Sequence, residues 1–536
     1  MGTKNFDNAL DLITFSRTSG GTALRRVGYG SELVTNGTFD TDLTGWTAAT
    51  AVTTALDNNT MRVSYTTGAG GTFYIGAYQS FSTAIGRQYK ATVDVTSVSS
   101  NTGRVRFEQS PGGGQNGNYT SLGLGSYTFY FVATATTTYI NLGMASDATG
   151  SVGFDNISVK EVIFDRATDP LVLFTHPAEI PRIEYDAAGA VKGLLIEEAR
   201  TNLLTYSEAF DNAAWTKINL SLGSGEISPD GTTVSDRLTA TVTGSTHTYP
   251  NARSSTIGVT YSTSVFAKAA THGIVQLNVP SSGNIFVNFD LTTGAKGVEN
   301  DCTANIEPIG GGWYRCSMTW VATSTTNSFG LSIVSLITSG RSTFTTSGYS
   351  VDVYGAQLEA GSFPTSYIPA ISGSTVTRAA DVASILVSAF GYNQTAGSVV
   401  VEATALSNVA GDYNSILSLQ SDINNRVDLG QISNDGYQVI NVAGTAVAGW
   451  NEGTAQNKDR YLLGVPHTTG IAFKTNSAIP SLDGVNGTED TALTIPVPTV
   501  LLLGDDSSTR KLNGHIKSIQ YYPRRLSNAQ LQELTT

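Results

Sequence analysis

The feature that most limits the possible folds is a period-two alternation of apolar and polar residues, which recurs along most of the chain. It occurs in short runs such as YKATVDVTSV, RVRFEQS and STSVFAKAA, and these runs are separated by Gly, Asn and Ser. Successive side chains of a strand point to opposite faces of a sheet, and Gly, Asn and Ser supply tight turns. The sequence therefore predicts an all-β protein made of multiple jelly-roll β-sandwich domains.

Composition sets the scale and excludes two classes of partner. With 536 residues, the chain exceeds the roughly 250 to 300 residues that one hydrophobic core can serve, so several domains are expected. A net charge of −12 argues against nucleic acid, since binding a polyphosphate needs clustered Lys and Arg. No run of 18 apolar residues occurs, so membrane insertion is not expected. The opening MGTKNFDNALDLITFSRTSGG also lacks the apolar stretch of a signal peptide, so we expect synthesis in a cytoplasm.

A weak repeat organises the first two thirds of the sequence. One copy begins with NGTFDTDLTGWT and ends with SVGFDNISVKEV, at Asn36–Val162. The other begins with SEAFDNAAWTK and ends with SVDVYGAQLEAG, at Ser207–Gly361. Each copy opens with Phe-Asp followed by a Trp, which places Trp46 and Trp215 at equivalent positions. A shared position favours a shared packing role, so both rings are predicted to be structural core residues.

The longest motifs lie around the second copy. They read PRIEYDAAGAVKGLLIEEARTNLLTYSEAFDNAAWTK, then VYGAQLEAGSFPTSYIPA and STVTRAAD. The matching pattern covers residues 11–21 and 181–381. It resembles the head-spike or head-fibre domain proteins of tailed bacteriophages, and related segments occur in tail fibres and tail-associated adhesins. The chain's final block, which contains LNGHIKSIQYYPRRLSNAQLQELTT, is similar to laminin-G-like or concanavalin-A-like modules. The first repeat copy more weakly resembles carbohydrate-binding modules of jelly-roll type.

These resemblances divide the chain. The expected parts are an N-terminal anchor segment at 1–30 that belongs with the second domain, an inserted carbohydrate-binding-like jelly roll at 31–163, a spike-fibre jelly roll at 164–381 and a lectin-like sandwich at 382–536. In the last part, Ser527 is expected to cap a terminal helix.

Aromatic residues beside turns are the candidates for carbohydrate contact. An aromatic ring can stack on the C–H face of a sugar, while amides and carboxylates bond the sugar's hydroxyl groups. Trp450 lies in the loop-like GWNEG, and Tyr249, Tyr413 and Tyr437 lie next to turn residues. We expect these four rings to be exposed.

Other chemistry-bearing residues point away from catalysis and leave some questions open. Glu197 and Glu198 could suggest glycosidic cleavage, but strand neighbours point to opposite faces, so a solvated turn or an ion pair with Arg200 is expected. Cys302 and Cys316 flank a Gly-Gly-Gly turn, and a disulfide and two buried thiols both remain open. The five histidines show no metal-ligand spacing.

Structural calcium is the one cofactor left open. Its candidate ligands are Asp155, Asn156, Asp352, Asp505 and Asp506, for which Asx turns are the alternative.

The sequence therefore predicts a non-enzymatic virion fibre or spike, on the head or the tail, that is assembled in the cytoplasm of a host bacterium. Its expected partners are other capsid or tail proteins, host-surface glycans and further copies of itself. The resemblance favours a homotrimer, in which repeated weak sugar sites add avidity. Two alternatives stay open: a structural decoration protein without glycan binding, and a polysaccharide depolymerase.

Overall fold

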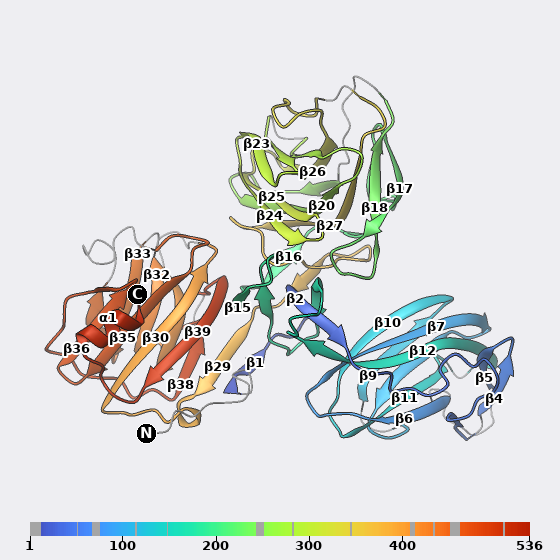
Figure 1. The fold of residues 1–536 in the computed structure, drawn as a ribbon, viewed down its shortest axis with the longest axis horizontal. Helices are drawn as coiled ribbons and strands as arrows, with labels where there is room; N and C mark the ends of the chain where they lie inside the picture. Colours follow the sequence, from blue (N-terminus) through green and yellow to red (C-terminus); the bar gives the residue numbers. More distant parts are fainter. Residues whose placement is uncertain are drawn as a thin grey trace. The chain divides into compact units, whose positions relative to one another are not determined.

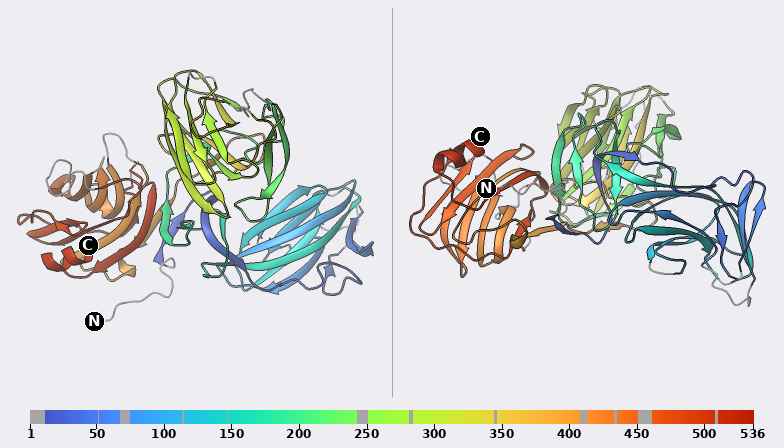
Figure 2. Two further views of the ribbon diagram at one scale, coloured as in Figure 1. Left: turned by 45° about the horizontal axis from the view of Figure 1, so that its top comes forward. Right: turned by 60° about the horizontal axis from the view of Figure 1, so that its bottom comes forward.

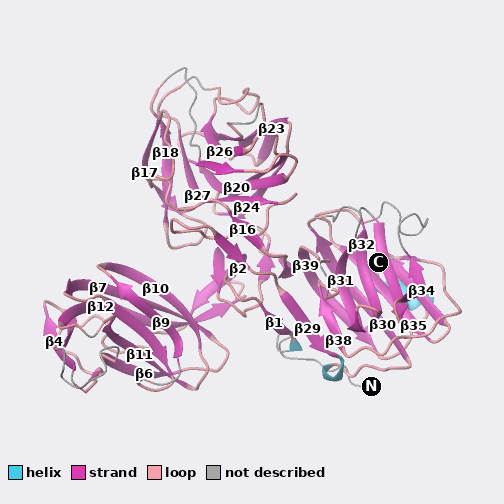
Figure 3. Ribbon diagram, turned by 180° about the vertical axis from the view of Figure 1, so that it is seen from behind, coloured by secondary structure: helices cyan, strands magenta, loops and turns pink. Residues whose placement is uncertain are grey.

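A computed structural model shows an almost purely β protein. It describes residues 12–50, 52–66, 75–112, 115–146, 148–242, 251–280, 284–343, 346–407, 413–432, 435–450, 461–507 and 510–536. Strands hold 55% of the residues and helices 2%. Figure 3 draws the strands in magenta and the helices in cyan. The prediction of multiple β-sandwich domains is confirmed.

Contacts divide the chain into two compact units (Figure 1). The smaller unit is Arg26–Pro170, and the larger unit joins the segment that ends at Arg25 to Leu171–Thr536. The smaller unit is thus an insertion within the sequence of the larger one.

The two ends of the insertion lie side by side. The Asp165 N–H donates to the Arg26 carbonyl at 3.1 Å, and the Val27 N–H donates to the Pro170 carbonyl at 3.1 Å. The chain therefore enters and leaves the smaller unit at one place.

The smaller unit is a sandwich of two antiparallel sheets around one core. The core gathers Phe39, Phe107, Phe131 and Phe154 with many aliphatic side chains. One sheet contains β10 (Gly125–Val132), β7 (Gln88–Ser99) and β12 (Gly150–Phe164), with β4 (Val52–Asp57) and β5 (Thr60–Tyr65) paired beside β12. The strand β2 (Gly21–Tyr29), which follows β12 in this sheet, begins before Arg26, and β13 (Leu171–His176), which follows β2, belongs to the larger unit. The other contains β3 (Thr47–Ala48), β6 (Ala77–Ser82), β11 (Thr137–Met144), β8 (Gly103–Glu108) and β9 (Gln115–Leu122).

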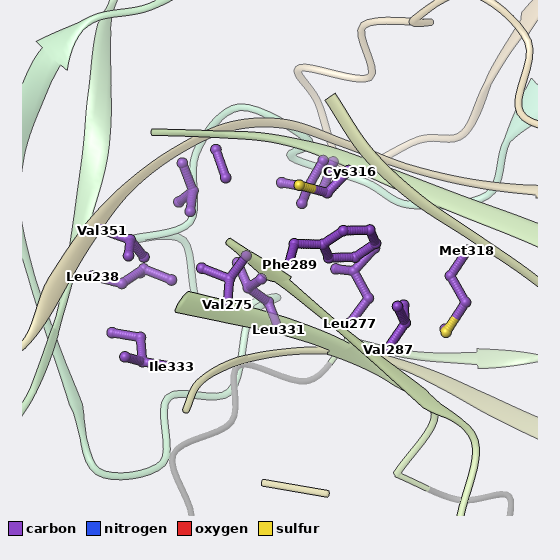
Figure 4. Close-up of a cluster of buried hydrophobic side chains, with 14 of the residues drawn as sticks. Leu238, Val275, Leu277, Val287, Phe289, Cys316, Met318, Leu331, Ile333 and Val351 are labelled. Atoms are coloured by element: carbon purple, nitrogen blue, oxygen red, sulfur yellow. The ribbon is translucent and has the colours of Figure 1, made fainter. Parts of the chain in front are cut away.

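The larger unit contains a middle sandwich with its own core. Alternating residues of facing strands interdigitate there, and Figure 4 shows Phe289 among Val275, Leu277 and Leu331. One sheet contains β17 (Leu220–Ile227), β18 (Val234–Ala240), β27 (Ser350–Ala360), β20 (Thr260–Ala269), β25 (Trp313–Val321) and β24 (Thr303–Gly310). The other contains β19 (Asn251–Ser254), β26 (Thr326–Ile333), β21 (Ile274–Asn278), β22 (Phe286–Asp290) and β23 (Ala295–Asn300), and β16 (Arg200–Asn202) pairs with β28 (Val376–Arg378).

The C-terminal sandwich of the larger unit contains two seven-stranded sheets. One has β1 (Thr14–Ser16), β29 (Val382–Leu386), β38 (Val500–Leu503), β31 (Tyr413–Asp422), β32 (Asn425–Ile432), β33 (Asp435–Val442) and β34 (Thr445–Trp450). The other has β14 (Ile183–Tyr185), β15 (Val191–Ile196), β39 (Gly514–Tyr522), β30 (Ala396–Ala405), β35 (His467–Lys474), β36 (Ser477–Leu482) and β37 (Val485–Asn486). A 3-10 turn, η2 (Val387–Ala389), follows β29.

Three strands of this sandwich come from outside the range 382–536 that the sequence predicts for it. β1 pairs with β29, and β15 pairs with β39. The sequence places the first 30 residues with the 164–381 domain; within them β1 joins the C-terminal sandwich, while Leu24 shares a buried cluster with Phe266 of the middle sandwich. Alternation predicts which face a strand buries but does not name its partner, so the sequence could not reveal this pairing.

The helix α1 (Asn528–Leu534) begins where the sequence predicts. Ser527 accepts a hydrogen bond from the Gln530 N–H, and Gln530 reaches back to the Ser527 N–H, which completes a capping box. Leu531 is buried with Val400 and Ile479, so the helix packs on the outside of the C-terminal sandwich, as Figure 2 shows. Within the described ranges, no helix has the length and apolarity needed to cross a bilayer.

Trp46 and Trp215 have matching surroundings in the two repeat copies. Each indole N–H donates at 3.0 Å to a backbone carbonyl shortly before it, at Asn36 and Tyr206. Each ring also contacts the Phe of the Phe-Asp pair, at 5.7 Å between the centroids in the first copy and 4.7 Å in the second. Trp215 is buried in its core, whereas Trp46 is half-buried and packs against its core from the edge.

Candidate functional site

The candidate site lies on the outer face of the five-stranded sheet of the smaller unit. In β8, Val105 and Phe107 point into the core. The residues between and after them, Arg106 and Glu108, therefore point to the opposite face.

Two neighbouring strands add aromatic and amide groups to the same face. In β11, Ile140 and Leu142 fill the core. Tyr139 and Asn141 therefore lie outward, where they pair in register with Glu108 and Arg106. Tyr78 of β6 is the register partner of Asn141 on its other side. We call the set Tyr78, Tyr139, Arg106, Glu108 and Asn141 the tyrosine face.

The polar members of the tyrosine face form a connected network. Arg106 Nη1 lies 2.7 Å from Glu108 Oε1, and the Asn141 amide donates to Glu108 Oε2 at 3.4 Å. Backbone N–H groups complete it: Gly112 donates to Glu108 and Gly76 donates to Asn141, both at 2.9 Å. All three polar side chains are buried although they lie outside the hydrophobic core. The network therefore lies beneath the accessible surface of the face and fixes the strands that carry the two tyrosines.

Two tyrosine rings provide the accessible part of the face. Tyr78 and Tyr139 are half-buried, and their ring centroids lie 6.1 Å apart at an interplanar angle of 61°. Exposed Ser80 follows on β6, and exposed Asn118 is the register partner of Arg106 on β9. Ring faces beside hydroxyl and amide groups can bind the apolar and polar sides of a sugar together.

The aromatic residues that the sequence predicts to contact carbohydrate differ in how exposed they are. Trp450 was expected to be exposed, but its ring is 6% exposed and its indole N–H donates to the Thr488 carbonyl at 2.7 Å. The reason is register, because Trp450 pairs with Gln438, which faces the interior and donates to Thr469. Tyr437, one position earlier in β33, is half-buried on the outer face.

The remaining two aromatic candidates fall outside what the structure describes. Tyr249 lies outside the described residues, and so does the side chain of Tyr413 at the start of β31. Carbohydrate contact by either tyrosine stays a prediction.

Glu197 and Glu198 have structural partners. The pair of Glu198 with Arg200, at 2.5 Å, is one of the two arrangements expected from the sequence. Glu197 is not in a solvated turn, because it is 2% exposed and lies 2.9 Å from Arg182. Burial opposes ionisation, but Arg378 and Arg182 lower the pKa of Glu197 to about 2. Glu197 belongs to a buried cluster that we call the arginine hub, which comprises Arg17, Arg182, Arg378, Glu197 and Asp381.

The calcium candidates are already bonded to protein groups. Arg237 binds Asp352 at 2.7 and 2.9 Å, Lys511 binds Asp505, and Arg510 binds Asp506 at 3.1 Å. Asp155 accepts from the Asn156 N–H at 2.7 Å, and the Asn156 amide donates to Asp94 at 2.8 Å. Among the described residues, no group of three or more His, Cys, Asp or Glu is arranged to hold a metal ion.

Cysteines and histidines are dispersed. Cys316 is a free thiol in the core of the middle sandwich, and Cys302 is a free thiol whose Sγ donates to the Phe286 carbonyl at 3.4 Å. Burial raises the pKa of Cys302 to about 11. The four described histidines are His176 in β13, His272 between β20 and β21, His467 in β35 and His515 in β39. His247 lies outside the described residues.

Sequence reasoning missed the tyrosine face. The alternation in the run RVRFE does indicate part of it, because Arg106 and Glu108 alternate with Val105 and Phe107 and so lie on the opposite face of the strand. Parity shows that such residues share one face of one strand. It does not show that Tyr78 and Tyr139, from runs far along the chain, lie beside them.

Comparisons with known proteins leave the family open. No protein-family model and no curated protein matches the sequence. Among solved structures, the tandem CBM22-1–CBM22-2 domain of Xyn10C from Paenibacillus barcinonensis is 12% identical, with a TM-score of 0.20 over 63% of this chain and 100% of that one. Domains LG4-5 of the mouse laminin alpha1 chain are 12% identical, with a TM-score of 0.19 over 64% and 95%. A Trypanosoma rangeli sialidase is 9% identical, with a TM-score of 0.23 over 91% and 93%. TM-scores this low support no argument about this chain.

Proposed function

We propose that this protein is a non-enzymatic fibre or spike of a tailed bacteriophage particle that attaches to glycans on the host surface. The observation that carries the proposal is the pair of half-buried rings, Tyr78 and Tyr139, beside the buried Arg106–Glu108–Asn141 network. The two rings beside the exposed Ser80 and Asn118 suit a sugar, because its C–H side can stack on a ring and its hydroxyl groups can bond the polar side chains. The spike-fibre resemblance of residues 181–381 supports the virion location.

Binding without cleavage fits the chemistry of the face. Hydrolysis of a glycosidic bond needs two carboxyl groups flanking it, one of which must hold a proton to give to the leaving group. Glu108 instead contacts the Arg106 guanidinium and accepts a hydrogen bond from a backbone N–H. Glu108 is also the only carboxyl group among the five residues of the tyrosine face, so the face does not supply the required pair.

The direct test measures binding of the purified full-length protein to a glycan array and to whole host cells, together with its mass in solution. Saturable binding that free sugar abolishes is expected, from a trimer. Tyr78→Ala and Tyr139→Ala should each weaken a single site by about 2- to 12-fold, the effect of losing about 0.5–1.5 kcal/mol of aromatic contact.

The matched control is Tyr130→Ala. Tyr130 is half-buried on the outer face of the other sheet of the smaller unit, so its loss should leave the affinity unchanged. Equal effects of all three variants, or no glycan binding by a correctly assembled oligomer, would refute the proposal. Release of reducing ends from host polysaccharide would show a depolymerase instead.

One observation favours a second candidate, a decoration protein that acts through subunit contacts. Ile227 and Val234 are register partners at the sheet edge formed by β17, and they are 51% and 55% exposed. An exposed apolar pair on an edge strand suits burial against another subunit. Ile227→Lys should then lower the oligomer mass while leaving sugar binding per subunit unchanged.

A further inference from the structure

A cavity lies in the larger unit. It measures about 820 Å³, near the upper end of the roughly 300–1,000 Å³ that small-molecule pockets span. It is lined by residues of the hairpin β24–β25 and by residues of β15, β30 and β39. We call this cavity the hairpin groove.

One wall of the hairpin groove is a ladder of polar side chains. Cys316, Met318 and Trp320 of β25 fill the core of the middle sandwich, so the residues between them face outward. Three cross-strand pairs line the groove, namely Thr303 with Thr319, Asn305 with Ser317, and Glu307 with Arg315. The wall thus offers hydroxyl and amide groups at a regular spacing along two strands.

Three carboxylates around the groove are paired with lysines. Lys192 lies 3.0 Å from Glu307 and 3.4 Å from Glu184, and Lys517 lies 2.8 Å from Glu402. Burial opposes the ionisation of Glu184, but Lys192 and His515 lower the pKa of Glu184 well below its usual range. Glu184 and Glu307 share Lys192, and Glu402 pairs with Lys517, so these lysines are already engaged and leave an acidic ligand little to bind.

One wall residue keeps an unused polar atom. The His515 side chain is 1% exposed and lines the groove, and its Nε2 contacts Glu184 at 2.5 Å. Its Nδ1 has no hydrogen-bond partner among the described residues. Because a hydroxyl group can both donate and accept, Nδ1 can form a hydrogen bond with a ligand hydroxyl whichever ring nitrogen carries the hydrogen.

We propose that the hairpin groove is a second carbohydrate site, which binds a neutral oligosaccharide along the Thr303–Asn305 ladder with a sugar hydroxyl on His515 Nδ1. The inference shares with the proposed function only the class of ligand, since none of its residues belongs to the tyrosine face. Glu197 and Ser366 also line the groove, and the Ser366 N–H donates to Glu197 at 2.7 Å.

The test uses the full-length protein and two sets of probes of equal length, neutral hexasaccharides and uronic-acid hexasaccharides. Titration calorimetry should find a neutral probe whose Kd rises about 5-fold or more in Asn305→Ala, the effect of losing one hydrogen bond. Asn305 is exposed, so the variant should keep its fold. Exposed Asn284 in the same sandwich gives the matched control, and Asn284→Ala should leave the Kd unchanged.

The outcomes separate the two sites. Binding that survives in Tyr78→Ala/Tyr139→Ala but falls in Asn305→Ala supports the groove. Binding that is lost in Tyr78→Ala/Tyr139→Ala but unchanged in Asn305→Ala overturns the proposal of a second site in the groove and leaves the proposed function unaffected. Failure of every neutral hexasaccharide to bind, or a preference for uronic-acid chains, also overturns the inference. A change of oligomer mass in Asn305→Ala without a change in Kd would overturn it too, and would make the groove a subunit contact.

Discussion

Replacing Asp381 by Asn should destabilise the larger unit strongly. Asp381 is 0% exposed, and its Oδ1 accepts from Arg17 at 3.0 Å while its Oδ2 accepts from Arg182 at 2.5 Å and from the Glu197 N–H at 2.9 Å. An asparagine keeps one acceptor oxygen, but its N–H₂ group then faces the N–H donors that the second carboxylate oxygen bonded. The variant therefore loses a charge and gains a clash between donors.

The magnitude follows from the charge balance of the arginine hub. It holds Arg17, Arg182 and Arg378 against two carboxylates, and backbone carbonyls such as those of Pro177 and Ile180 accept from the excess guanidinium groups. Burial and Arg182 lower the pKa of Arg17 to about 10, so the group stays charged at neutral pH. Removing one partner from a buried ion pair costs about 3–5 kcal/mol, because it leaves an uncompensated charge.

Urea unfolding followed by tryptophan fluorescence measures this loss. Four of the five tryptophans belong to the larger unit, and Trp46 alone reports on the smaller one. Asp381→Asn should lower the free energy of unfolding of the larger unit by about 3–5 kcal/mol. Exposed Asp301 provides the control, and Asp301→Asn should stay within about 0.5 kcal/mol. A loss below about 1 kcal/mol in Asp381→Asn would refute the view that the hub is a strongly coupled buried network.

Four further predictions concern other parts of the chain. The pKa of Glu197 is lowered to about 2 in the folded state, so its contribution to stability is complete above about pH 4.5 and lost as the pH falls toward 2; urea unfolding of Glu197→Gln should be less dependent on pH in that window. Ser527→Ala removes the capping box and should cost about 1 kcal/mol, while a Ser527→Asp control retains most of it. Burial raises the pKa of Cys316 far above its usual range, so a thiol reagent should label it only in denaturant, and rapid labelling at neutral pH would contradict its burial. A chain in which a short Gly-Ser linker replaces residues 27–169 should keep cooperative unfolding of the larger unit, because the ends of the insertion are adjacent; a molten product would show that the larger unit needs the insertion.

Local features were predictable from the sequence, whereas pairing between distant segments was not. The alternation of apolar and polar residues predicted the all-β class, and Ser527 predicted the start of α1. Both features are determined by residues close together in the sequence. Trp450 was misplaced because GWNEG resembles a loop, although Trp450 ends a strand whose register turns the ring inward. Tyr78 and Tyr139 were missed because register between β6, β11 and β8 brings them to one face with Arg106, and register is set by the fold.

The arginine hub also sets an order of events during synthesis. Arg17 and Asp381 are 364 positions apart in sequence. A ribosome that adds about 5–20 residues per second needs about 20–70 s between them. During that interval all strands of the inserted unit and of the middle sandwich are made, but β1 has no β29 to pair with. The segment of β1 and Arg17 therefore waits unpaired on the nascent chain, where a chaperone or a second nascent copy can reach it before its own sandwich closes.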